Sequence, residues 1–313
     1  MRPDHLIIVS EGFDGHGQSV SYDSQDLMLA PAQQLSQIES AFSQIFKKVT
    51  TVSDANSFVR EISSFASCIV LPYSYGPGSE INRVAHVTAA CEAVRLPYIG
   101  ADSYTRILCR DKWLSQRFIK DFGLDTPPSV IIRRIDETKK ASQLPKPIIV
   151  KPNSQSNSFF IDRNSVVDSI GLAAKRIEEI LLIGDCVIAE QFIDAEEYSI
   201  CYIGSKRSIS LRQVIQRVPN KNTIDEKYKN AILDYRTNQV PGFIRTQVGS
   251  NEIPPEILRR TDELFRSLTK CNYLRIDGRF DGERFFIIEL TPDAGLAPSH
   301  SISKAAEFAG LSY

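Results

Sequence analysis

The sequence predicts an α/β protein that begins with an open parallel sheet. Three short apolar runs occur in the first hundred residues, at 6–9, 68–71 and 96–99. Apolar runs this short, without alternating polar residues, are typical of strands that are buried on both faces of a parallel sheet. Stretches with helical periodicity at 25–46 and 79–95 separate them. Strands that alternate with helices predict a parallel sheet with ligands at the carboxyl ends of its strands.

The composition gives no sign of a nucleic-acid or membrane partner. The chain has 313 residues, 42% hydrophobic and 24% charged, with a formal net charge of −1. Such a charge creates no field that would attract nucleic acid or an anionic membrane. No window approaches the length of a membrane span, the first apolar run is too short for a signal peptide, and the cysteines form no CxxC pair. These features predict a cytoplasmic protein with reduced cysteines.

The middle of the chain continues the mixture of helices and strands. The predicted elements are a helix over 111–120, a strand over 147–151, a polar loop over 153–158, a helix over 164–182 and a strand over 186–193. The first of these strands ends in a lysine and the second contains an acid, so both bring charge to the edge of a predicted sheet.

The last third predicts an antiparallel arrangement. Residues 198–217 indicate a meander, and 254–270 indicate a helix. The polar, irregular stretch 219–245 predicts a mobile loop over a site, because long loops within compact domains are usually functional.

Two carboxylates near the C-terminus provide the first chemical signal. Two apolar strands, carrying Asp277 and Glu289, are joined by the turn 281–284 as a hairpin. Paired carboxylates suit a hard divalent cation such as Mg²⁺, which bridges nucleotide phosphates. The alternative is a hairpin whose acids are simply solvated.

Six motifs then follow a specific order along the chain. They are Asp111-Lys112 at a helix start, Val-Lys151-Pro at a strand end, Ala-Glu190-Gln-Phe-Ile193, Glu197, Arg275-Ile-Asp277 and Ile-Ile-Glu289. In this order they resemble the ATP-grasp superfamily and, within it, the D-alanine–D-alanine ligase family. The ending from Gly295 to Tyr313 is similar to that family without a gap. The similarity covers residues 96–313 well and 1–95 only in outline.

The resemblance implies an α/β ATP-grasp fold of three lobes. An N-terminal lobe with an open parallel sheet would cover residues 1–103, a central α+β lid 104–185, and a C-terminal α+β lobe 186–313. ATP would lie between the last two lobes. A homodimer is left open, because members of the family are commonly dimeric.

The resemblance also implies how the phosphates of ATP are bound. Lysines that match Lys112 and Lys151 neutralise them in the family. The loop that covers them matches the segment ending in Asn157 and Ser158, which are expected to contact the nucleotide. This loop is normally rich in glycine, so that backbone N–H groups can approach phosphates, but here it contains none.

The nucleoside end of ATP is expected at the linker after the strand over 186–193. The linker residues are Glu190, Gln191, Phe192 and Ile193. In the resemblance, backbone groups at Gln191 and Ile193 bind the adenine edge and Phe192 lies against its ring. Glu197 matches the acid that holds the ribose hydroxyls, with Glu196 as the alternative register.

The resemblance assigns metal ligands to the hairpin. Asp277 and Glu289 match the magnesium ligands, and one or two ions are expected. The third ligand of the family is an asparagine, whereas this chain has Thr291, whose hydroxyl is a weaker ligand. Asp293 is an alternative ligand two residues further on.

Four residues are expected to act on the substrates. Arg275 matches the arginine that steadies the transferred phosphate, a role that suits its planar, permanently charged fork. Gly295 matches the glycine whose N–H faces the developing oxyanion. The pair that holds the acceptor carboxylate in the family aligns with His300 and Ser301.

The expected reaction is ATP-dependent ligation of a carboxylate to an amine, usually of an amino acid, through an acyl phosphate. The N-terminal loops at 11–19 and 72–78 lack the residues that read the first D-alanine in the family, and so does the region 235–239. We therefore expect small-molecule substrates other than two D-alanines. The alternatives are a genuine D-alanine–D-alanine ligase and a nucleotide-binding module without catalysis.

Overall fold

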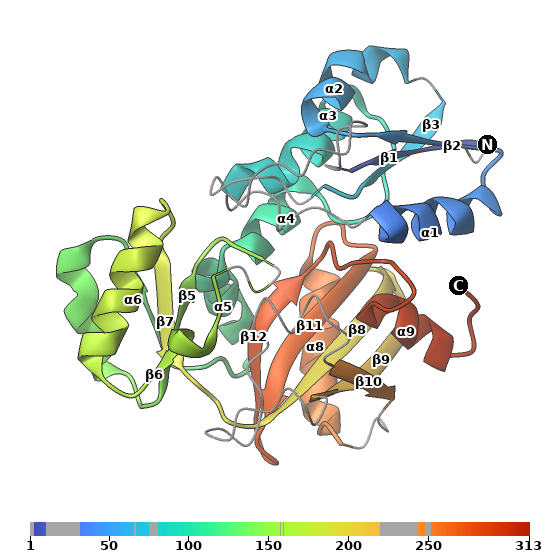
Figure 1. Ribbon diagram of the computed structural model, residues 1–313. Coiled ribbons are helices and arrows are strands. Elements are labelled where there is room, and N and C mark those ends of the chain that lie inside the picture. The colour runs from blue at the N-terminus through green and yellow to red at the C-terminus, as the bar shows by residue number, and fades with distance from the viewer. Residues whose placement is uncertain are drawn as a thin grey trace.

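The computed structural model describes residues 3–10, 32–65, 67–74, 81–156, 158, 160–219, 243–247 and 252–313. Within these ranges the chain forms three sheets, each with its own helices, and they appear in Figure 1 as three lobes. The N-terminal loop 11–19, Asn157 and most of the predicted loop over 219–245 lie outside the described residues.

The N-terminal sheet is parallel, as predicted, with the strand order β2–β1–β3. Its strands are β1 (His5–Val9), β2 (Lys48–Val52) and β3 (Cys68–Pro72). The prediction of a strand over 96–99 is wrong, because this segment forms an isolated bridge between Tyr98 and Val70. The edge strand β2 has the sequence KVTTV and is only half-buried, so it lacks the continuous apolar run that identified its neighbours.

Helices cover both faces of this sheet (Figure 1). On one face α1 (Ala32–Ser43) packs against Leu6 and Ile8. On the other face α2 (Ala55–Glu61) and α3 (His86–Val94) pack against Ile7 and Val9. The short 3-10 helices are η2 (Ile62–Ser64) and η3 (Ile81–Ala85).

Two consecutive helices, α4 (Ser103–Arg110) and α5 (Lys112–Lys120), lead from the N-terminal lobe to the rest of the chain (Figure 1). The carboxylate of Asp111 accepts a hydrogen bond from the N–H of Leu114 at 2.9 Å, so it caps α5 where the sequence predicts a helix start. Across the part of the chain that is described, no helix is long and apolar enough to cross a membrane.

The middle sheet is antiparallel, with the strand order β4–β7–β5–β6. Its strands are β4 (Ser129–Ile132), β5 (Ile148–Pro152), β6 (Val166–Val167) and β7 (Val187–Gln191). One face is covered by α6 (Ile170–Leu182) and η4 (Ile135–Gln143), and η5 (Arg163–Ser165) precedes β6. The helix predicted over 164–182 therefore starts later, where Ser169 caps α6. The sheet itself reaches beyond residue 185, because β7 pairs with β4 and β5.

The C-terminal sheet is antiparallel, with the strand order β10–β9–β8–β11–β12. Its strands are β8 (Glu196–Ser205), β9 (Ser208–Pro219), β10 (Phe243–Gln247), β11 (Tyr273–Phe280) and β12 (Phe285–Thr291). The predicted hairpin is confirmed as β11 and β12. Helix α8 (Pro255–Ser267) packs on one face, and α9 (Ser301–Phe308) covers one end of the other.

Candidate functional site

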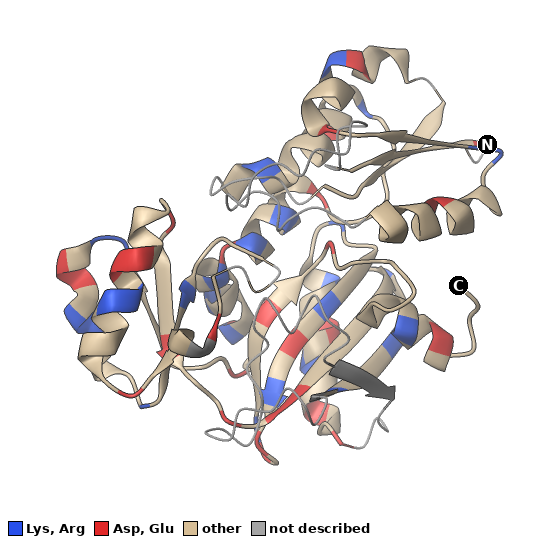
Figure 2. Ribbon diagram, in the orientation of Figure 1, with Lys and Arg blue, Asp and Glu red and all other residues tan. Residues whose placement is uncertain are grey.

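One face of the C-terminal sheet is charged beyond the end that α9 covers, whereas the other face is apolar. Asp277 of β11 lies opposite Ser199 of β8 on one side and Glu289 of β12 on the other, and Arg279 lies opposite Glu197. Side chains directly opposite each other point to the same face of a sheet. Figure 2 shows the acidic and basic segments on these strands. The apolar face packs under α8 through Tyr198, Ile200, Tyr202, Leu274, Ile276 and Leu290.

A β-bulge in β12 allows both carboxylates to face the same way. Asp277 pairs with Glu289, but the next residue, Gly278, pairs with Ile287, so Ile288 is an extra residue. As a result Ile287 and Leu290 both enter the apolar core while Glu289 stays on the charged face. Gly278 is required here, because a Cβ would lie 2.5 Å from the ring of Phe285.

Arg275 holds Asp277 from the same strand. Arg275 Nε lies 2.8 Å from both carboxylate oxygens and Nη2 lies 2.7 Å from Oδ2, while Ser199 Oγ donates to Oδ1 at 2.6 Å. Burial raises the pKa of Asp277, but attraction to Arg275 and Arg217 outweighs it, so the pKa lies below its ordinary value. Asp277 is therefore an ionised carboxylate at neutral pH.

Lys112 connects α5 to the second carboxylate. Its Nζ lies 3.5 Å from Glu289 Oε1, although the two residues are far apart in sequence. Burial lowers the pKa of Lys112, the attraction of Glu289 opposes this shift, and repulsion from Lys151 adds to it. The structure thus brings a predicted phosphate ligand together with a predicted metal ligand.

Lys151 and Glu190 form a buried ion pair within the middle sheet. Lys151 Nζ lies 2.5 Å from Glu190 Oε1, and the two side chains are 7% and 2% exposed. Gln116 Nε2 donates to the other carboxylate oxygen at 2.8 Å, and Ser129 Oγ donates to Gln116 at 2.5 Å. Both oxygens of Glu190 therefore have partners, and its side chain orients the lysine that is predicted to meet phosphate.

The linker that joins the middle and C-terminal sheets is fastened by Arg279. Arg279 Nη1 donates to the carbonyl of Ile193 at 2.9 Å, and its guanidinium lies 4.7 Å from the centre of the Phe192 ring. The N–H of Gln191 donates to Pro128 at 2.9 Å. The predicted adenine linker is thus held from both sheets.

Glu197 lies between two buried arginines. Arg217 Nη1 donates to Glu197 Oε1 at 2.7 Å, and Arg279 Nη2 lies 3.6 Å from Oε2. The sequence analysis did not identify Arg217 and Arg279 as partners of Glu197, because a charged residue within a strand is usually solvated. The available signal was alternation, which places Arg279 on the same face of β11 as Asp277.

The loop after β5 is described over 153–156 and at Ser158, which has a left-handed φ of 58°. Lys112 Nζ donates a hydrogen bond to the carbonyl of Gln155. The predicted contact of Asn157 lies outside the described residues, so the structure places one of the two loop residues predicted to meet the nucleotide.

The loop after β12 brings Gly295 and His300 into contact. A Cβ on Gly295 would lie 1.6 Å from His300 Nδ1, so only glycine fits beneath this imidazole. His300 occupies the N-cap position of α9, and the buried Ser301 is its first residue. Asp293, the alternative metal ligand, pairs instead with the fully buried Arg106, whose Nη1 lies 3.5 Å from Asp293 Oδ2.

The donor set fits one hard cation. Among the described residues there is no group of three or more His, Cys, Asp and Glu side chains that could hold a metal. Asp277 and Glu289 form a pair, and the hydroxyl of Thr291 lies 3.4 Å from Arg275 Nη2. These ligands are all oxygens, as Mg²⁺ prefers, and phosphate oxygens and water could complete its shell.

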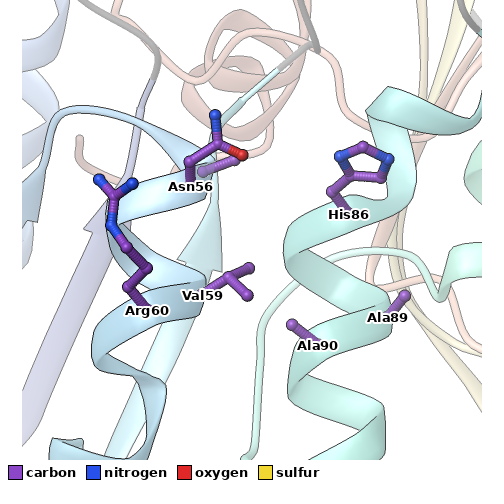
Figure 3. A pocket seen from close by; sticks show the side chains of 7 residues that line it. Asn56, Val59, Arg60, His86, Ala89 and Ala90 are labelled. Carbon is purple, nitrogen blue, oxygen red and sulfur yellow. The ribbon is translucent and has the colours of Figure 1, made fainter.

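A pocket of about 470 Å³ lies elsewhere, between α2 and α3 (Figure 3). It is lined by Ala55, Asn56, Val59, Arg60, His86, Ala89 and Ala90. None of the predicted site residues lines it. We take the charged sheet face as the candidate site, because ionised groups of the C-terminal sheet meet Lys112 of α5 there, whereas the pocket walls are largely small apolar side chains.

Comparisons with known proteins show what this chain is similar to. The family profile of the ATP-grasp domain matches residues 109–251. A D-alanine–D-alanine ligase of Thermotoga petrophila is 19% identical over 278 residues, which are 88% of this chain and 86% of that protein. An uncharacterised protein of Sinorhizobium fredii is 27% identical over 237 residues, which are 74% of this chain and 67% of that protein.

Solved structures show the same fold. The D-alanine–D-alanine ligase from Bacillus anthracis, complexed with ATP, superposes with a TM-score of 0.69 at 18% identity, covering 98% of this chain and 91% of that chain. The VanG D-Ala:D-Ser ligase from Enterococcus faecalis gives a TM-score of 0.67 at 16% identity, covering 99% and 96%. Residues 109–251 therefore match the ATP-grasp domain, and the described chain has the fold of these ligases. The chain is D-alanine–D-alanine ligase-like, and the predicted resemblance and fold are confirmed.

Proposed function

We propose that this protein is an ATP-dependent carboxylate–amine ligase that forms an amide bond through an acyl phosphate. The observation that carries the proposal is the pair Asp277 and Glu289, which lie opposite each other on one sheet face with Arg275 and Lys112 beside them. These cations, and carboxylates that could hold Mg²⁺, would supply the charge neutralisation that phosphoryl transfer between anions needs. The names of the relatives support the same reaction class.

In the first step, a carboxylate oxygen of the substrate attacks the γ-phosphorus of ATP. The new O–P bond forms as the bond from phosphorus to the β,γ-bridging oxygen breaks, which gives an acyl phosphate and ADP. Lys112 and Lys151 would neutralise the phosphates. Asp277 and Glu289 would hold Mg²⁺, which supplies charge neutralisation between the phosphates when bound.

Arg275 is suited to bind the phosphoryl group while it moves from ATP to the substrate carboxylate. Its Nε and Nη2 are committed to Asp277, while no acceptor for Nη1 occurs among the residues described. Nη1 could therefore donate to a phosphoryl oxygen without releasing Asp277.

In the second step, the amine attacks the acyl carbon, phosphate leaves, and the amine loses its proton to solvent or to the departing phosphate. The N–H of Gly295 would face the oxyanion of the tetrahedral intermediate. His300 and Ser301, beside it, would orient the acceptor.

We further propose that the substrates are not two D-alanines. This is supported by the N-terminal loop sequences, which lack the family residues that read the first D-alanine, and by His300 at the acceptor position. The names of the relatives favour the second candidate, a genuine D-alanine–D-alanine ligase. Measuring ADP formation with different substrates distinguishes the two candidate functions. Purified protein with Mg²⁺-ATP should form ADP with some carboxylate and amino-acid pools but not with D-alanine alone.

The control is the Asp277→Asn variant, which keeps the side-chain shape and should lose turnover in every pool. Rapid ADP formation with D-alanine alone would establish the second candidate. ATP binding without ADP formation in any pool would instead favour a nucleotide-binding module without catalysis.

A further inference from the structure

Two buried cations fasten the turn that follows β5. Lys112 Nζ donates to the carbonyl of Gln155, and Arg110 Nη1 donates to Ser156 Oγ. Lys112 is 6% exposed and Arg110 is 8% exposed. Arg110 ends α4 and Lys112 begins α5, so a single residue, Asp111, separates the two cations along the chain.

The same turn is tied by its backbone on the other side. The N–H of Asn153 donates to the carbonyl of Cys186 at 2.8 Å, and the N–H of Ser154 donates to Asp185 Oδ2 at 3.0 Å. These two amides are therefore committed within the protein. The turn contains no glycine and presents oxygens, from Gln155 and Ser156, to the cations. A phosphate arriving here would meet side-chain cations before backbone amides.

Arg110 and Lys112 belong to a larger cluster of positive charge. Lys151 and Arg110 both lower the pKa of Lys112, in addition to its burial, which indicates that the three charges are within electrostatic reach of one another. Figure 2 shows basic segments along α4. Glu289 pairs with Lys112 and Glu190 pairs with Lys151. Arg110 adds a third buried positive charge, which a bound anion can balance better than the hydroxyl of Ser156 can. The cluster is suited to a ligand with several negative charges.

We propose that Arg110 is a third phosphate-binding cation, beside Lys112 and Lys151, and that Ser156 Oγ and Gln155 O occupy the positions that phosphate oxygens take. The inference rests on the proposed function for the location of the polyphosphate. The planar guanidinium of Arg110 can donate two parallel hydrogen bonds to one phosphate. It would supply charge where the glycine-free turn offers few amides.

Calorimetric titration of the full chain tests this assignment. MgATP, MgADP, AMP and inorganic tripolyphosphate would be titrated into wild type, Arg110→Met and the control Lys120→Met, which removes an exposed cation from the end of α5. For Arg110→Met we expect a loss of at least about tenfold in affinity for tripolyphosphate and MgATP, with AMP unchanged. The control should match wild type.

Two further variants separate binding from structure. Arg110→Lys keeps the charge but loses the paired hydrogen bonds, so its affinity for tripolyphosphate should lie between those of wild type and Arg110→Met. This variant also tests the proposal if Arg110→Met does not fold. Ser156→Ala removes only the competing hydroxyl and should leave the affinity unchanged or raise it a few-fold. An equal loss for AMP and ATP in Arg110→Met, no loss at all, or a loss in Ser156→Ala equal to that in Arg110→Met would overturn the proposal.

The ligase activity and the role of Arg110 can be refuted independently. Arg110-dependent binding of tripolyphosphate without ADP formation in any substrate pool would sustain the role of Arg110 and refute the ligase activity. Wild-type protein that binds neither nucleotide nor tripolyphosphate would overturn both.

Discussion

The imidazole of His300 lies directly against the Cα of Gly295, where a Cβ would come within 1.6 Å of Nδ1. Gly295→Ala must therefore displace His300 or the loop between them. If Gly295 faces the oxyanion and His300 orients the acceptor, ligase turnover should fall by at least about tenfold, because small misplacements in a reacting site are costly. The measurement is ADP release at saturating MgATP. Gly171→Ala is the matched control, because it adds a methyl to α6 with nothing within 4 Å. Unchanged turnover in Gly295→Ala would contradict this placement.

The buried pair of Lys151 and Glu190 predicts strong coupling. Lys151→Met leaves a buried carboxylate without its cation, and we expect a loss of about 3–5 kcal/mol in the free energy of unfolding. The double variant Lys151→Met with Glu190→Gln should recover much of that loss, because no charge then stays buried alone. Urea unfolding of the single and double variants measures the coupling. Additive losses would mean that the two charges do not interact.

For Glu197, unfolding measurements distinguish a structural role from a role in binding the ribose. Its carboxylate lies between Arg217 and Arg279, so Glu197→Ala leaves two buried arginines facing each other. The expected loss of unfolding free energy is about 3–5 kcal/mol without any nucleotide. If Glu197 served only to bind the ribose, its replacement by alanine would weaken nucleotide binding and leave the free energy of unfolding without nucleotide unchanged. Urea unfolding without nucleotide, followed by titration with AMP, separates the two roles.

Asp185 predicts a dependence of stability on pH. Burial raises its pKa above the ordinary value, so the protonated form is favoured in the folded state. This contribution is complete below the unfolded pKa of about 3.9 and is lost as the pH rises through the folded pKa. Asp185→Asn resembles the protonated form and still accepts from Ser154. Its melting temperature should equal or exceed that of wild type at pH 7, with the difference shrinking below pH 4. A variant that melts lower at pH 7 would contradict this sign.

Much of the fold was accessible from local patterns, whereas the contacts of the site were not. The hairpin of Asp277 and Glu289 and the capped helix at Lys112 follow from short-range signals, namely alternation and an N-cap aspartate. Strand β2 was missed because an edge strand with two threonines carries no apolar run. The pairing of Arg279 with Glu197 depends on strand register, which periodicity leaves undetermined.

The same limit applies to Arg106 and Arg110. Both lie on α4, and their partners are Asp293, about 190 residues downstream, and Ser156, in the turn after β5. A helical pattern assigns charged residues to the solvated side by default, so it cannot identify a buried arginine whose partner arrives from another lobe. Such residues become visible only when the packing of lobes is known.

The extra residue in β12 decides which face of the sheet the side chain of Glu289 points to. With Phe285 fixed in the core, strict alternation would send residues 287, 289 and 291 inward with it, and both Glu289 and Thr291 would be enclosed among apolar side chains. Because Ile288 is inserted, the even-numbered Leu290 points into the core and the odd-numbered Glu289 points to the charged face. Without Ile288 the two strands would pair regularly, Gly278 with Ile287 and Asp277 with Glu289, and Glu289 would keep its direction. A chain that keeps Ile288 but fails to form the bulge would instead turn Glu289 into the apolar core, although every side chain would be chemically intact.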